Sequence, residues 1–108
     1  MAFQVEELSI QLIEVLVPLM SRIKQRDKAL EDQLRRAASS IGLNCAEAKF
    51  SDPGNRKARL FTAAGSAGEA QHALRQAIAW GRVRTGDAAP TLALTRRIIA
   101  ILWSMTRG

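Results

Sequence analysis

The fold is decided by residues 33–47, which read Gln33-Leu34-Arg35-Arg36-Ala37-Ala38-Ser39-Ser40-Ile41-Gly42-Leu43-Asn44-Cys45-Ala46-Glu47. Apolar residues recur in this stretch every three or four positions, which is the period of an α-helix with one packed face. The pair Arg35-Arg36 places positive charge on the same helix, and Asn44 falls on the apolar stripe itself. The stretch therefore predicts a packed helix with a basic surface and one polar group within the packing.

The rest of the chain extends this helical prediction. Its abundant residues, Ala, Leu, Ile, Arg, Gln and Glu, favour helices, and no segment alternates as a half-buried strand does. A chain of 108 residues suits one domain with a single core. Four helices are expected, over residues 3–23, 27–50, 56–82 and 90–106. Because the connections are short, the predicted class is an all-α, antiparallel up-down-up-down four-helix bundle covering residues 1–108.

The expected helices begin and end at local signals. Asp27 is predicted to cap the second helix, and residues 51–55 read as a loop. Pro90 suits the first turn of the fourth helix. Pro18 lies inside the first pattern and is expected to bend that helix.

The first helix is apolar around most of its circumference. It carries two adjacent apolar stripes, one formed by Val5, Leu8, Leu12, Val15 and Leu19 and the other by Ile10, Ile13, Val17 and Met20. Such a helix must be buried on more than one side, which a small monomeric bundle cannot do for a peripheral helix. A homo-oligomer is therefore expected.

Two glycines, Gly65 and Gly68, lie in the middle of the third helix. Each costs about 1 kcal/mol of helix propensity relative to alanine. The expected return is the close approach of another helix backbone.

The formal net charge of +6 is unevenly distributed. Residues 1–21 hold three Glu and no Lys or Arg, whereas the rest of the chain holds 16 basic and seven acidic residues, a net charge of +9. A basic surface attracts phosphates or anionic lipid, although a solvated face that maintains solubility is the simpler alternative. The candidate nucleic-acid contacts are Arg22, Lys24, Arg26, Lys28, Arg35, Arg36, Lys49, Arg56, Lys57, Arg59, Arg82 and Arg84.

These basic residues predict contacts with phosphates that do not depend on sequence. In an up-down bundle, residues 22–28 and 82–84 share one end, and the cluster around residues 49–59 lies at the other. Reading of bases is not expected, because the few aromatic side chains are interpreted as core or interface residues: Phe50, Phe61, Trp80 and Trp103.

Several polar residues fall within or beside the apolar stripes. Asn44 and Gln71 are expected to meet each other, or to meet Glu47 and Glu69, between the second and third helices. Because buried polar groups need partners, these residues are predicted to have a structural role that sets the helix register: Asn44, Glu47, Ser66, Glu69 and Gln71. The alternative, metal ligation or acid–base chemistry by Glu47 and Glu69, is disfavoured because a di-metal bundle needs two Glu-x-x-His motifs.

The sequence does not predict an enzyme, a metal site or a cofactor. Cys45 has no cysteine partner and is expected to be a packed thiol. His72, the single histidine, is expected at the surface or an interface. The N-terminus lacks the basic region of a secretory signal and the apolar runs are too short to span a bilayer, so a cytoplasmic protein without membrane contact is expected.

The same residues resemble a known family. The segments Gln33–Ala37, Ser40-Ile41, Asn44 and Ala46-Glu47 look like the central signature of the 23S rRNA intervening sequence proteins. In the second half, the residues at the family's spacing are Ala63, Gly65-Ser66, Glu69, Leu74, Ala77 and Gly81. The chain departs from the pattern at Ala48, where glycine is usual, and at Trp80, where an aliphatic residue is typical.

The resemblance implies an antiparallel four-helix bundle that forms a pentameric ring. It also extends to a relative of the same fold, the accessory variability determinant of diversity-generating retroelements, a basic pentamer that works with a reverse transcriptase and nucleic acid. The predicted function is therefore non-enzymatic binding of RNA or DNA by a homopentamer. The alternative is a scaffold that binds a protein partner, such as a reverse transcriptase, without binding nucleic acid.

Overall fold

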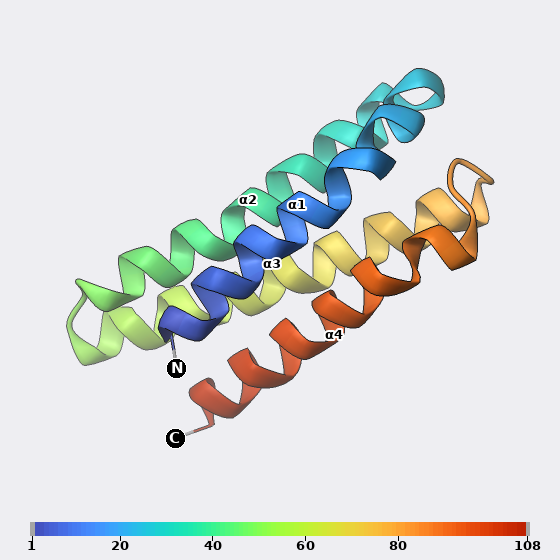
Figure 1. Cartoon of the computed structure of the whole chain (residues 1–108). Helices are drawn as coiled ribbons and strands as arrows, with labels where there is room; N and C mark the ends of the chain where they lie inside the picture. The colour runs from blue at the N-terminus through green and yellow to red at the C-terminus, as the bar shows by residue number, and fades with distance from the viewer. Residues whose placement is uncertain (1, 108) are drawn as a thin grey trace.

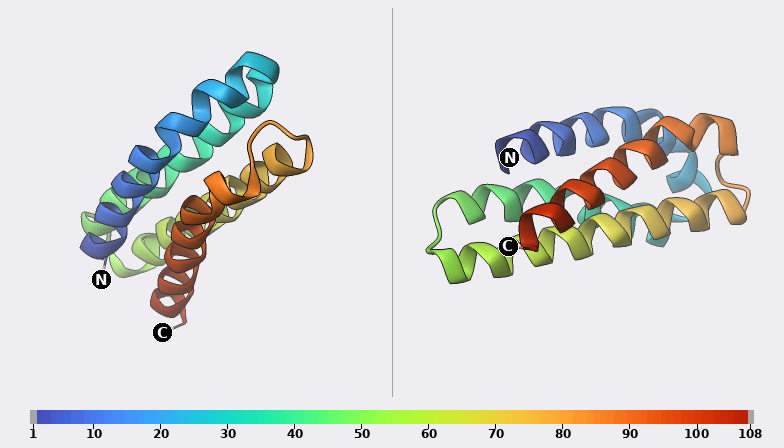
Figure 2. Two further views of the ribbon diagram at one scale, coloured as in Figure 1. Left: turned by 45° about the vertical axis from the view of Figure 1, so that its right-hand side comes forward. Right: turned by 90° about the horizontal axis from the view of Figure 1, so that it is seen from below.

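The computed structural model describes residues 2–107, with side chains from residue 4 onward. It contains four helices, α1 (Ala2–Arg26), α2 (Lys28–Lys49), α3 (Pro53–Ala79) and α4 (Thr85–Thr106), and the described residues contain no strand. Figures 1 and 2 show the chain turning back at each connection, so that α1 lies beside α2 and α4, and α3 lies beside the same two helices. The prediction of an all-α fold with four helices is confirmed, and the bundle measures 42 × 22 × 19 Å.

Side-chain caps explain where α2 and α3 begin. The Asp27 carboxylate accepts a hydrogen bond from the Leu30 N–H at 3.0 Å, which confirms the predicted cap. Asp52 does the same for the Asn55 N–H at 3.0 Å, and Pro53 occupies the first turn, where its missing N–H removes no helical bond. The loop predicted over residues 51–55 is therefore wrong in its last three residues.

The connection between α3 and α4 is shorter than the sequence predicted. α3 ends at Ala79, and Gly81 then adopts a φ of 73°, a conformation that favours glycine. α4 begins at Thr85, so the placement of Pro90 in its first turn is wrong. Asp87 lies in that turn instead, where a carboxylate interacts favourably with the helix dipole. α1 continues as a helix through Pro18.

Helices α1, α2 and α4 contribute large aliphatic side chains to the core, whereas α3 contributes mostly alanine. Fully buried residues include Leu12 of α1, Ile41 of α2 and Ile98 of α4. In α1, Leu16 is buried, whereas the neighbouring Val15, which the sequence predicted to be buried, is 36% exposed. The buried residues of α3 are mostly small: Leu60, Ala63, Ala64, Ser66, Ala67, Ala70, Ala73, Leu74 and Ala77.

The glycines of α2 and α3 have different surroundings. A Cβ atom added at Gly65 or Gly68 would meet nothing within 4 Å, so the predicted close helix approach at these positions is wrong within the chain. A Cβ atom at Gly42 would lie 2.6 Å from Ser9 Oγ, whose hydroxyl donates to the Glu6 carbonyl at 2.7 Å. The tight approach of α1 to α2 is therefore at Gly42.

Three polar side chains form a cluster where α2 meets α3, and one hydrogen bond of this cluster joins the two helices. The Ser66 hydroxyl donates to Ser40 Oγ at 2.8 Å, and Asn44 Nδ2 donates to the same oxygen at 3.0 Å and to the Ser40 carbonyl at 2.9 Å. Asn44 and Ser66 are buried, whereas Glu47 and Glu69 are exposed and Gln71 is half-buried. The expected contacts of Asn44 with Gln71, Glu47 or Glu69 are thus replaced by contacts with Ser40, because Ser40 lies one turn before Asn44 on the same side of α2.

Candidate nucleic-acid interface

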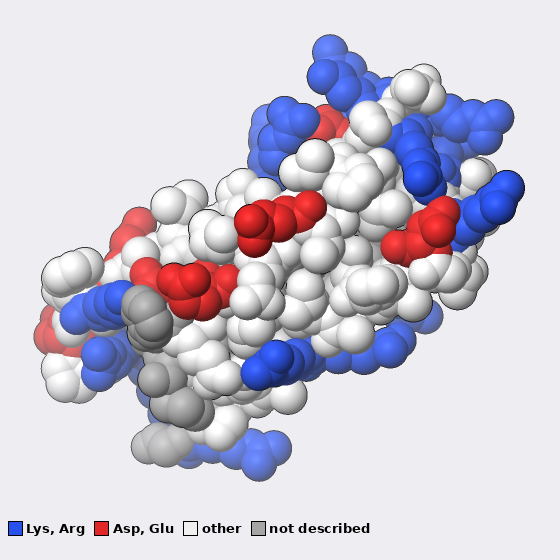
Figure 3. Space-filling view, in the orientation of Figure 1, with Lys and Arg blue, Asp and Glu red and all other residues white. Residues whose placement is uncertain are grey.

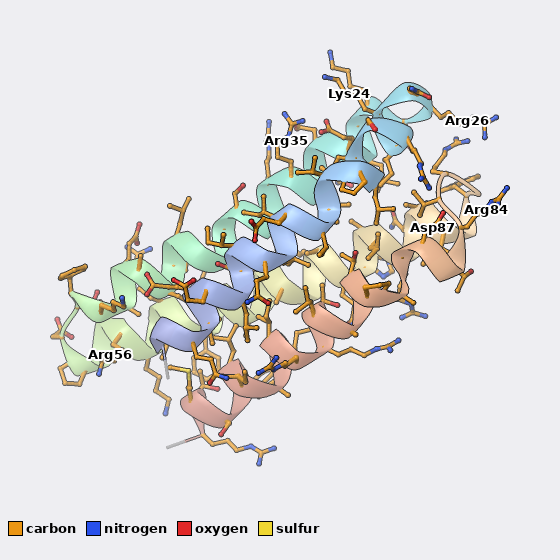
Figure 4. All side chains as sticks on the ribbon, in the orientation of Figure 1. Lys24, Arg26, Arg35, Arg56, Arg84 and Asp87 are labelled. Atoms are coloured by element: carbon orange, nitrogen blue, oxygen red, sulfur yellow. The ribbon has the colours of Figure 1, made fainter. Side chains whose placement is uncertain are left out.

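Basic side chains lie at both ends of the bundle. Figure 4 shows Lys24, Arg26 and Arg84 at the end where α1 meets α2 and α3 meets α4, and Arg56 at the opposite end. Residues 22–28 and 82–84 are brought to one end because the two connections that carry them lie side by side. The candidate residues at this end are Arg22, Lys24, Arg26, Lys28, Arg82 and Arg84.

One ion pair ties the two connections of this end together. Arg22 Nη1 lies 2.8 Å from Asp87 Oδ2, which joins α1 to the first turn of α4. Arg82 is half-buried, and its Nε atom has no hydrogen-bond partner among the described residues. Within residues 2–107, no ion pair holds the exposed side chains of Lys24, Arg26, Lys28 and Arg84.

The arginine pair of α2 is held by acids one turn earlier. Arg35 pairs with Glu31, whose side chain is only 4% exposed, and Arg36 Nε lies 3.0 Å from Asp32 Oδ2. A buried carboxylate is costly without a nearby cation, so Arg35 has a structural role in balancing the charge of Glu31.

The opposite end is also partly neutralised. Lys49 pairs with Glu6, and Arg59 Nη1 lies 3.1 Å from Glu47 Oε2. Arg56 Nε donates to the Ala48 carbonyl at 3.4 Å, near the C-terminus of α2. Lys57 is exposed.

The charge differs between the two halves of the bundle. Residues 1–52, with α1 and α2, contain seven basic and eight acidic residues, whereas residues 53–108, with α3 and α4, contain nine basic and two acidic residues. Figure 3 shows basic side chains at both ends and along the edge formed by α4. Positive charge therefore dominates the half that contains α3 and α4.

Four exposed arginines of this half were missed by the sequence analysis, because they do not cluster near a turn. They are Arg75 of α3 and Arg96, Arg97 and Arg107, which lie on or directly after α4. Within the described part of the chain, none of them forms an ion pair. The signal that could have found them is the scarcity of acids after Asp52.

The aromatic residues were predicted to lie in the core or at an interface; the core placement is wrong, and the interface stays a prediction. Phe50, Phe61, Trp80 and Trp103 are 90%, 44%, 66% and 49% exposed. Phe61 of α3 and Trp103 of α4 pack edge to face, with ring centroids 6.0 Å apart and planes at 75°. This pair marks the position where the outer faces of α3 and α4 meet.

A polar groove runs between α2 and α3, with a volume of about 870 Å³. Arg36, Glu69 and the exposed His72 are among the side chains that line it. Within residues 2–107, no group of three or more His, Cys, Asp or Glu side chains is placed to hold a metal ion.

Cys45 is fully buried within the core. Burial, and secondarily the negative charge of Glu6, raises the pKa of the Cys45 thiol to about 11. A thiol with this pKa is almost entirely protonated at neutral pH and is a poor nucleophile. The placement of Cys45 agrees with a packed thiol.

No helix within residues 2–107 is both long enough and apolar enough to cross a bilayer.

The fold and its surface define a small four-helix bundle with an excess of positive charge. The model of the 23S rRNA-intervening sequence protein family matches residues 1–104. The chain belongs to this family, and the resemblance noted in the sequence is confirmed.

A solved structure has the same fold. It is the crystal structure of a protein with unknown function from the S23 ribosomal protein family of Bacteroides thetaiotaomicron VPI-5482, with a TM-score of 0.87 and 20% sequence identity. The similarity covers 96% of this chain and 99% of the other. No curated protein matches the chain.

Proposed function

We propose that this protein is a non-enzymatic homo-oligomer, a pentameric ring of antiparallel up-down-up-down bundles, that binds RNA or DNA without sequence preference in the cytoplasm. The observation that supports the proposal is the net charge of residues 53–108, which contain nine basic and two acidic residues. Nucleic acids attract such a surface through their phosphates, and the contacts need no base recognition.

The proposed contacts begin with exposed basic side chains that have neither an ion pair nor a hydrogen bond among the described residues. They are Lys24, Arg26, Lys28, Lys57, Arg75, Arg84, Arg96, Arg97 and Arg107. Exposed pairs such as Arg22–Asp87 contribute about 0–1 kcal/mol. A phosphate can therefore displace the carboxylate of such a pair at little cost.

An apolar face between α1 and α2 supports the oligomeric part of the proposal. We define the α1–α2 apolar face by Ile10, Ile13, Val17 and Leu43, which are 55%, 36%, 63% and 64% exposed. These residues line adjoining hollows between the two helices. Contiguous apolar surface of this kind is typical of protein contacts, and a second copy of the chain is the proposed occupant.

Light scattering tests the oligomer. The double variant Val17→Glu/Leu43→Glu is expected to reduce the molar mass to that of a monomer, because a carboxylate in an apolar interface lacks a partner. Gln11→Glu/Gln25→Glu, which adds the same two negative charges at exposed positions of α1, is the matched control and is expected to leave the assembly intact. A wild-type protein that is monomeric at micromolar concentration would contradict the proposal.

Nucleic-acid binding is tested by fluorescence anisotropy with labelled RNA across a salt series. The logarithm of the affinity is expected to fall linearly with the logarithm of salt concentration, with a slope of about −0.7 per phosphate contacted on a single strand. Absence of binding at about 50 mM salt, well below physiological ionic strength, would contradict the proposed function.

The α1–α2 apolar face also favours a second candidate function, that of a scaffold for another protein. A reverse transcriptase is the kind of partner suggested by the family resemblance. This function predicts a complex with such a partner that survives nuclease treatment and is lost in the Val17→Glu/Leu43→Glu variant. Nucleic-acid binding would then be absent even at low salt.

A further inference from the structure

Exposed aromatic and basic side chains share one face of α3 and α4. In α3, Phe61 and Arg75 are two heptads apart, and Lys57 precedes Phe61 by one turn, so the three lie on one side of the helix. On α4, Arg96 precedes Trp103 by one heptad, and Arg107, directly after the helix, follows Trp103 by one turn, so these three also lie on one side. All six are exposed, and we call them the α3–α4 stripe.

The Phe61–Trp103 contact shows that the two helices bring these residues to a common surface. Because the chain turns back between α3 and α4 (Figure 2), moving toward their connection leads from Phe61 to Arg75 on one helix and from Trp103 to Arg96 on the other. Moving the opposite way leads to Lys57 and Arg107. Positive charge therefore lies on both sides of the aromatic pair.

The stripe contains no acidic residue. Residues 53–108, the half of the chain that carries the stripe, contain two acidic residues, Glu69 and Asp87. Glu69 lines the groove on the α2 side of α3, and Asp87 is held by Arg22. A polyanion bound along the stripe would therefore contact no carboxylate side chain of α3 or α4.

We propose that the α3–α4 stripe binds a single strand of nucleic acid, with phosphates at its arginines and lysine and a base stacked on the exposed face of Trp103, whose ring packs edge to face with Phe61. This inference rests on the proposed function and assigns it a face and a ligand class. Aromatic side chains stack on any unpaired base, whereas paired bases in a duplex hide their faces. Trp80, 66% exposed beside Arg82 and Arg84, continues the same chemistry at the end of α3.

The length of the stripe suits a short segment of nucleic acid. From Lys57 to Arg75 the helix rises about 27 Å, which corresponds to at most roughly eight nucleotides if the strand keeps the duplex rise of about 3.4 Å per phosphate, and to fewer if the strand is extended. This number lies within the range of about 4–16 nucleotides that is typical of single-strand sites.

The experiment compares a ten-nucleotide oligouridylate with a ten-base-pair RNA duplex, using anisotropy and tryptophan fluorescence. The single strand is expected to bind more tightly and to quench Trp103. Trp103→Leu, which keeps an apolar side chain but removes the aromatic face, is expected to weaken single-strand binding by at least about fivefold and to leave duplex binding unchanged. Phe50→Leu, at an aromatic residue that lies outside the stripe, is the matched control and is expected to have no effect.

The outcomes separate this inference from the proposed function. Equal affinity for both probes, unchanged in Trp103→Leu but weakened in Arg75→Gln/Arg96→Gln, would overturn base stacking and retain binding by charge. Loss of binding to both probes at low salt would overturn the proposed function as well. A Trp103→Leu protein with a smaller molar mass by light scattering would assign the aromatic pair to a subunit contact and also overturn the inference.

Discussion

The half of the bundle formed by α1 and α2 and the half formed by α3 and α4 share one fold but differ in core and surface. The first buries large aliphatic side chains, such as Leu12 and Ile41, and has nearly balanced charge with an exposed apolar face. The second packs an alanine-rich α3 and exposes arginines and aromatic rings. The proposed function assigns the contacts between subunits to the first half and the contacts with nucleic acid to the second.

Removing charge from the α3–α4 half is expected to have the largest effect on binding. Changing Arg75, Arg96, Arg97 and Arg107 to Gln should reduce the slope of the salt dependence by about 3 and weaken single-strand binding by roughly 100-fold at low salt. The measurement is a salt titration by anisotropy. Four Gln substitutions in the other half, at Lys24, Arg26, Lys28 and Arg36, are expected to weaken single-strand binding less. A larger loss of binding from these four substitutions would contradict the comparison between the two halves.

The two cores are expected to respond differently to a change of side-chain volume. Leu12→Ala should lower the free energy of unfolding by about 2–5 kcal/mol, because it leaves a cavity in a fully buried site. Ala67→Leu should lower it by about 1–3 kcal/mol, because the alanine face of α3 has no room for a larger side chain. Urea denaturation of both variants measures the two losses in the free energy of unfolding. An Ala67→Leu protein that is more stable than wild type would contradict the prediction for α3.

Glycine substitutions distinguish the close helix contact from the open surface. Gly65→Ala and Gly68→Ala are each expected to raise the free energy of unfolding by about 0.5–1 kcal/mol, through helix propensity alone. Gly42→Ala should show no such gain, because the new methyl group displaces the Ser9 hydroxyl. In a Ser9→Ala background the same Gly42→Ala change should become stabilising. Thermal denaturation of wild type, the two single variants and the double variant measures the coupling energy between positions 9 and 42.

The last prediction concerns Cys45, whose effect on the comparison is absent at neutral pH. Its pKa is raised from 9.0 to about 11 in the folded protein, so the unfolded chain loses the thiol proton first. Stability from this group is therefore complete below pH 9 and falls as the pH rises toward 11. In denaturation experiments, the stability of wild type relative to Cys45→Ala should fall with pH across that range and should be independent of pH near neutrality.

The helices could be predicted from the sequence because their apolar periods are long and uninterrupted. Their ends were harder to predict, since Asp52 and Asp87 provide start signals a few residues before the first clear apolar positions. The α3–α4 stripe could not be found by looking for clustered charges. Its basic residues lie 18 positions apart on α3 and 11 positions apart along α4, and the relation between the helices appears only once Phe61 is seen to contact Trp103.

The contacts among Ser40, Asn44 and Ser66 have a consequence for the uniqueness of the fold. The buried face of α3 is rich in methyl groups, and sliding it along α2 by two turns, for example, would bring Ala70 and Ala77 to the places of Ala63 and Ala70. Such an alternative would break the hydrogen bond between Ser66 and Ser40 and leave the buried Ser66 hydroxyl without this partner, at a cost of about 1–3 kcal/mol. One hydrogen bond between two small side chains thus separates the native packing in energy from its near neighbours.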